Sequence, residues 1–255
     1  MKIATPISNL FNSNLDAERI ISLSDCLECR DHSLDSIFPN QEVFHCDIQL
    51  IQGWGQKELD YLRLIKKNKP DLKLISFHMA SCFDAPALIN KRFIPGGKKL
   101  SIQEMKNHSI VNTSDAHRIF GNNIFIALEN NNDLKTEAYD YVTDPDFISE
   151  IVVTNDIRFL YDIAHAKISS FNQNTTFENY AKKLPLHKLS QVHISKPGFT
   201  PENEIVDAHE LPGQEEIQEV ILLLEKYKIE YLTIEYYKDT ANLLQLLSSV
   251  KQIMR

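Results

Sequence analysis

Short apolar runs alternate with segments of helical periodicity along the whole chain. A bounded apolar run of four to eight residues indicates a buried strand. Eight such runs occur, at residues 2–8, 25–30, 42–47, 72–78, 123–129, 157–163, 189–195 and 231–237. Apolar residues at helical spacing predict helices between the strands, at residues 15–23, 57–68, 147–152, 177–184, 215–228 and 240–255.

This alternation predicts parallel strands joined by helical crossovers. Eight repeats predict closure into a (β/α)8 TIM barrel, and 255 residues is close to the usual size of that fold. No Pro/Ser-rich linker divides the sequence, so we expect a single TIM-barrel domain over residues 1–255. Asp146, directly after Pro145, is the predicted N-cap of the helix at 147–152.

Two connections are longer than usual for this architecture, and both follow predicted strands. The first runs from Ala80 to about Ile102 and carries a basic segment, Lys91–Lys99. The second runs from Lys196 to Gln214. Loops at the C-terminal ends of barrel strands often form substrate walls or lids. The basic segment is then either a solvated turn or a cap that meets a phosphate or carboxylate.

Composition and charge bear on the partners and the cellular compartment of the protein. The formal net charge of −8 disfavours duplex nucleic acid as a partner, because phosphate binding needs a cationic surface. No apolar run approaches the roughly 18 residues of a membrane span, and the N-terminus lacks the pattern of a signal peptide. We therefore expect a cytoplasmic protein without a membrane partner. The cysteines are expected to be reduced and buried; they are Cys26, Cys29, Cys46 and Cys82.

Metal-ligand side chains follow the later strands. Glu129, Asp162, His193 and Glu235 end the fifth to eighth predicted strands. In a closed barrel these ends meet at one mouth, where side chains from different strands form a common site. Three carboxylates and an imidazole suit a divalent ion such as Mn²⁺, Mg²⁺, Zn²⁺ or Fe²⁺. Without a cation the carboxylates would repel, and their pKa values would have to rise.

Further side chains could extend this site and bind additional metal. His45 and His78 end the third and fourth strands, and His165 follows Asp162 by three residues. Asp207 and His209 form a DxH motif in the second long loop. Residues two apart on an extended backbone point the same way, so this pair can bind one ion.

Several short motifs carry a family resemblance. They are LEN at Leu128–Asn130, DIAH at Asp162–His165, HISKPG at His193–Gly198, DAHE at Asp207–Glu210 and IEY at Ile234–Tyr236. With these motifs the chain resembles the xylose isomerase-like TIM barrel superfamily. That superfamily includes sugar phosphate isomerases and epimerases as well as the AP-endonuclease family 2.

The resemblance implies a metal-dependent isomerase or epimerase of a small sugar or sugar derivative. In such epimerases the residues matching Glu129, Asp162, His193 and Glu235 bind the metal. The two glutamates also transfer the proton, and His165 is a further catalytic candidate. An arginine that often meets the substrate is absent here, and Lys196 is the expected substitute.

Other branches of the superfamily leave alternatives open. In the endonucleases, residues matching all nine candidate ligands hold three zinc ions. Iron oxygenases that modify peptide cysteines use a similar multinuclear ligand set. A non-enzymatic barrel that retains a metal site is the third alternative. Barrels of this type often pair, so a homodimer is a further expectation.

Overall fold

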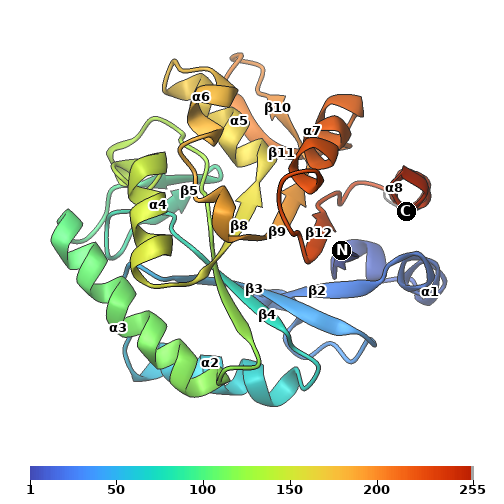
Figure 1. The fold of residues 1–255 in the computed structure, drawn as a ribbon, viewed down its shortest axis with the longest axis horizontal. Coiled ribbons are helices and arrows are strands. Elements are labelled where there is room, and N and C mark those ends of the chain that lie inside the picture. The colour runs from blue at the N-terminus through green and yellow to red at the C-terminus, as the bar shows by residue number, and fades with distance from the viewer. Residues whose placement is uncertain (254–255) are drawn as a thin grey trace.

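Eight parallel strands close into a barrel at the centre of the protein, whose structure is a computed structural model describing residues 1–253 (Figure 1). The barrel strands are β1 (Lys2–Pro6), β2 (Cys26–Arg30), β3 (Gln41–Gln49), β4 (Leu74–His78), β7 (Phe125–Glu129), β8 (Arg158–Asp162), β9 (Leu189–Ile194) and β12 (Tyr231–Ile234). Neighbours around the ring run β1-β12-β9-β8-β7-β4-β3-β2. The predicted TIM barrel is confirmed.

Helices surround the strands (Figure 1). They are α1 (Asn14–Leu23), α2 (Gln56–Asn68), α3 (Ile102–Phe120), α4 (Pro145–Thr154), α5 (Ile163–Asn172), α6 (Phe177–Ala181), α7 (Gln214–Leu224) and α8 (Thr240–Ile253). Short 3₁₀ turns lie at η1 (Asn9–Phe11), η2 (Asp31–Ser33), η3 (Glu137–Tyr139) and η4 (Leu186–Lys188). The last two residues of the helix predicted at 240–255 lie outside the described residues.

The barrel interior changes from apolar to polar along the strands. A layer of buried apolar side chains fills the end nearest the strand N-termini; its members are Ala4, Cys26, Val43, Leu74, Ala127, Leu160 and Tyr231. Inward-facing residues recur every second position. The inward residue that follows Val43 is His45, the one after Ala127 is Glu129, and the one after Leu160 is Asp162. The apolar layer therefore forms a floor beneath the candidate ligands.

Two helices are not among those predicted from periodicity. On α3, the buried face includes Ser109, Asn112 and Thr113, so the apolar pattern is broken. Its start was nevertheless readable, because Ser101 and Glu104 form a capping box. Helix α5 begins directly after β8 without a loop, so no turn residues in the sequence mark where the strand ends and the helix begins.

Both long connections contain hairpins where the sequence predicted only loops. The first holds β5 (Ala87–Ile89) and β6 (Arg92–Ile94), and the second holds β10 (Lys196–Phe199) and β11 (Ile205–Glu210). Three of these strands have only three or four residues, and none of the four is a buried apolar run, so they are hard to recognise from sequence.

The cysteine prediction agrees with the structure, in which all four thiols are free and buried. Each helix among residues 1–253 is too short or too polar to span a bilayer.

The N-cap of α4 is two residues earlier than predicted. Asp144, not Asp146, holds this position, and its Oδ1 accepts hydrogen bonds from the backbone N–H groups of Asp146 (2.8 Å) and Phe147 (3.2 Å). Pro145 occupies the first helical turn, where its missing N–H costs nothing.

We predict that Asp144→Ala lowers the free energy of unfolding by about 1 kcal/mol, the usual cost of losing an N-cap. Asp146→Ala is the matched control, since it removes only an exposed ion pair with Lys183. Urea unfolding of both variants measures the difference. Equal losses would contradict the assigned cap.

Candidate metal centre

The four strand-end residues predicted as metal ligands converge on one point inside the barrel mouth. His193 Nδ1 lies 3.3 Å from Glu129 Oε1, 3.3 Å from Glu235 Oε1 and 4.0 Å from Asp162 Oδ2. All four side chains are buried. Three carboxylates therefore face the same imidazole nitrogen.

A second group shares Glu129 with the first. Glu129 Oε2 lies 3.3 Å from His45 Nε2 and 3.0 Å from His78 Nδ1. The other oxygen of Glu129 faces His193, so this carboxylate can bridge two ions. His45 and His78, predicted as possible additional ligands, thus lie beside the central four.

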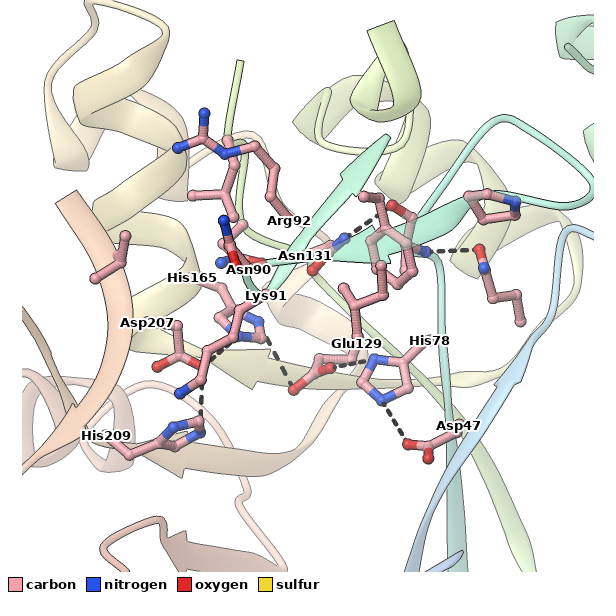
Figure 2. A pocket seen from close by; sticks show the side chains of 18 of the residues that line it. Asp47, His78, Asn90, Lys91, Arg92, Glu129, Asn131, His165, Asp207 and His209 are labelled. Atoms are coloured by element: carbon pink, nitrogen blue, oxygen red, sulfur yellow. Dashed lines mark hydrogen bonds and ion pairs between the residues drawn. The ribbon is translucent and has the colours of Figure 1, made fainter. Parts of the chain in front are cut away.

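A third group comes from β11 and α5. His209 Nε2 lies 3.1 Å from Asp207 Oδ2 and 3.4 Å from Glu235 Oε2, and His165 Nε2 lies 3.5 Å from Asp207 Oδ2. His209 has a φ of 44°, in the left-handed region that non-glycine residues adopt uncommonly. Figure 2 shows His165, Asp207 and His209 on one side of Glu129 and His78 on the other.

The unpaired atoms in this cluster fit bound cations. Glu129 Oε2, Asp162 Oδ2, His193 Nδ1 and Asp207 Oδ1 are buried and accept or donate no hydrogen bond within residues 1–253. A buried polar atom without a partner costs about 1–3 kcal/mol, which a coordinated ion would offset. Imidazole and carboxylate donors suit Fe²⁺, Mn²⁺ or Zn²⁺. The set exceeds the four to six donors of one such ion, so it suits two or more.

Hydrogen bonds behind the histidines fix which ring nitrogen faces the cluster. His45 Nδ1 contacts Ser76 Oγ at 2.7 Å, and His165 Nδ1 donates to the carbonyl oxygen of Asn130 at 2.9 Å. Each contact leaves Nε2 directed at the carboxylates. Partners of this kind orient metal-binding histidines in proteins generally.

Glu28 belongs to the site although the sequence analysis did not identify it. Its Oε2 accepts hydrogen bonds from His193 Nε2 (3.0 Å), Gln191 Nε2 (2.7 Å) and Thr233 Oγ1 (2.9 Å). Its Oε1 accepts from Arg30 Nε at 3.0 Å. Glu28, His193 and Glu235 lie close enough to hold an ion. However, both oxygens of Glu28 are already occupied, so it orients His193 and leaves Nδ1 free.

Arg30 and Asp47 were also missed. Arg30 forms ion pairs with both Glu28 and Glu235, and Asp47 Oδ1 lies 3.7 Å from His78 Nε2. The available signal was the pair of charged residues Glu28 and Arg30 inside the predicted strand at residues 25–30. Buried charges are rare unless they are paired, so two charged residues in a buried strand indicate a polar network.

Burial and neighbouring charges shift the pKa values of the cluster strongly. Burial raises the pKa of Asp162 to about 7, and Glu235 and Glu129 add to this effect. Burial lowers the pKa of His45 to about 4. Burial opposes the charge on His193, but Glu28 and Glu235 raise its pKa well above the usual value. In the metal-free protein, histidine protons therefore neutralise part of the carboxylate charge.

The cluster lies in a cavity of about 1150 Å³. Both hairpins contribute to its wall, and they are joined by an ion pair of 2.8 Å between Arg92 and Glu204. Lys196, predicted to contact substrate, has an exposed side chain on β10 and does not line this cavity. The cationic side chains that do line it are Arg30, Lys91, Arg92 and Lys238.

We predict that Glu28→Gln lowers metal affinity about 10- to 100-fold, the usual effect of losing an orienting partner. The number of ions bound at saturation should stay the same. Chelator competition and elemental analysis measure these two quantities. Glu42→Gln is the control, because Glu42 pairs with Lys2 on β1 and does not line the cavity. Loss of a whole ion in Glu28→Gln would instead make Glu28 a ligand.

Metal binding should release protons. Burial disfavours charge on His165 and His193, but the carboxylates around them raise both pKa values well above 6.5, so both rings are protonated at pH 7. A metal needs the neutral rings, so its affinity should increase as the pH rises from about 6 to 8. Calorimetric titration in buffers of different ionisation enthalpy measures the released protons. Affinity that is independent of pH would contradict this electrostatic arrangement.

Solved structures with a similar fold include several sugar epimerases. A D-tagatose 3-epimerase-like protein has a TM-score of 0.63 at 16% identity, with 99% of this chain and 98% of that chain covered. D-psicose 3-epimerase from Clostridium cellulolyticum H10 gives 0.61 at 11% identity, with the same coverage. D-allulose 3-epimerase from Methylomonas sp. gives 0.58 at 14% identity, covering 99% and 96%. At these identities the similarity shows the (β/α)8 barrel fold and nothing finer.

The sequence itself gives a narrower match. No curated protein matches this chain. A protein family does match over residues 67–255, which is more than half of the chain and includes most of the cluster from His78 onward. The chain therefore belongs to the family of RiPP precursor modification enzymes MbnB/TglH/ChrH.

Proposed function

We propose that this protein chemically modifies a cysteine of a ribosomally made precursor peptide at a centre of two or more metal ions. The proposal is supported by the family match and by the cluster itself. The observation that carries it is the excess of donors. A single-metal epimerase needs only four of them, whereas His45, His78, Asp207 and His209 extend the cluster on both sides.

Some residues of the cluster would bind the metal ions, and others would hold the ligands in position. The groups around Glu129, His193 and Asp207 would hold the ions, and bound iron would supply redox chemistry for altering a thiol. Arg30 fixes Glu235 and Glu28, which in turn fixes His193. The apolar floor closes the barrel below, so substrate enters through the open mouth.

The size of the cavity favours a peptide over a free sugar. At about 1150 Å³ it exceeds the roughly 300–1,000 Å³ of ordinary small-molecule pockets. A monosaccharide would fill a small part of it. Both hairpins stand along its wall, where an extended chain could lie.

A sugar epimerase is the second candidate, and one observation favours it. Glu129 and Glu235 face the same nitrogen of His193 at equal distances of 3.3 Å, an arrangement that would suit proton removal and return on two faces of a sugar. This candidate uses the four central ligands with Glu129 and Glu235 as the acid/base pair. It leaves the outer histidines without a role.

We predict that co-expression of this protein with the short reading frames beside its gene changes the mass of one peptide product. Mass spectrometry of the peptides measures the change. The change should disappear when the cysteine of that peptide is replaced by serine. It should also disappear in the Glu235→Gln variant, which removes a carboxylate that faces both His193 and His209.

The alternative is tested on the same protein preparation. A panel of ketoses in D₂O reports epimerisation by deuterium incorporation at the carbon beside the carbonyl. Rapid exchange into a sugar, with every peptide unmodified, would overturn the peptide proposal in favour of the epimerase.

A further inference from the structure

The hairpin of β5 and β6 has one covered edge and one free edge. Asn90 and Lys91 form its two-residue turn with φ values of 49° and 62°, as in a type I′ turn. Ile89 and Arg92 flank this turn and pair with each other. In such a hairpin the flanking pair exchanges both ladder hydrogen bonds, so the next pair directs its backbone groups outward.

That next pair is Leu88 and Phe93. The outward groups of Phe93 are satisfied by the protein, because its N–H donates to Tyr139 Oη at 2.9 Å and its carbonyl accepts from Thr136 Oγ1 at 2.7 Å. The N–H and carbonyl of Leu88 point away from the opposite edge. They have no partner within residues 1–253, and β5 has β6 as its single neighbouring strand there.

The hairpin with this free edge lines the candidate site. Residues 84–86, Leu88 and the turn all line the cavity that holds the metal cluster. Leu88 and Ile89 are 64% and 54% exposed, so the edge is apolar as well as unpaired. An exposed apolar edge strand promotes aggregation unless something covers it.

The tip of the hairpin adds a positive charge. Figure 2 shows the Lys91 side chain pointing into the cavity, toward Asp207 and His209. The neighbouring cations at the mouth are already paired, Arg92 with Glu204 and Lys238 with Glu210. Lys91 forms no ion pair within the described part of the chain, so it is available to an anionic group of the substrate.

We propose that an extended segment of the peptide substrate adds to β5 as a third strand and pairs its backbone with Leu88. An acidic group or thiolate of that segment then lies beneath Lys91, close to the metal cluster. This inference rests on the proposed function. Strand addition to an exposed edge is a common mode of peptide recognition, in which main-chain hydrogen bonds supply affinity. The charge of Lys91 complements the segment and sets its position relative to the reacting centre.

Leu88→Pro tests the backbone contact directly. Proline removes the outward N–H but no ladder hydrogen bond, and edge strands tolerate it at such positions. Leu88→Ala is the matched control, because it loses the same side chain and keeps the N–H. The probe is the fluorescein-labelled peptide that co-expression shows to be modified, and its Kd is measured by fluorescence anisotropy.

We expect Leu88→Pro to bind this peptide about tenfold more weakly than Leu88→Ala, with equal metal content in both. Exchange of the Leu88 amide hydrogen in the unsubstituted protein should slow when peptide is added. This second measurement does not depend on how well the proline variant folds. Lys91→Ala should weaken binding, and Lys91→Arg should restore it.

Three other outcomes would contradict docking of the peptide on β5. Equal binding by the proline and alanine variants, with unchanged amide exchange, would overturn docking on β5 while leaving the peptide chemistry intact. A dimer that Leu88→Pro dissociates in sedimentation would show that the edge pairs with a second copy of the chain. If no peptide is modified at all, the proposed function fails and this inference fails with it.

Discussion

The structure depends on the need to neutralise carboxylates that are gathered inside a barrel and shielded from water. Glu28, Glu129, Asp162 and Glu235 are each at most 2% exposed. Unscreened charges of one sign at such short range repel strongly. In the metal-free protein the compensation comes from Arg30 and from protons on His165 and His193. Bound cations would take over that role and free the histidines to act as ligands.

The barrel makes this arrangement possible through the two-residue periodicity of its strands. Residues two apart on a strand both point into the barrel, so an apolar floor residue can be followed by a ligand, as Ala127 is followed by Glu129 on β7. The floor excludes water from below, and the two hairpins and their connecting ion pair form the wall above. Fold, burial and chemistry are thus set by the same alternation.

Much of this could be read from the sequence, because each strand is a short apolar run that ends in a distinctive polar residue. All nine candidate ligands, which are the six strand-end residues, the DxH pair and His165, lie in one cluster. The charges of Glu28 and Arg30 in a predicted strand indicate a polar network, but the role of Glu28 could not be predicted, since it depends on contacts with Gln191 and Thr233 from distant strands. Lys196 was expected to contact substrate in place of an arginine of similar epimerases; it has an exposed side chain on β10 and does not line the cavity. The lysine that does line the cavity is Lys91, in the turn of the hairpin formed by β5 and β6.

The number of ions bound at the barrel mouth shows directly whether the protein has a multinuclear metal centre. Anomalous diffraction from crystals of the iron-loaded protein locates each ion and reports its element. We expect at least two iron peaks, one between His193 and Glu129 and another beside His45 and His78. A single peak among Glu129, Asp162, His193 and Glu235, under saturating metal, would contradict a multinuclear centre and leave the outer histidines without a metal-binding role.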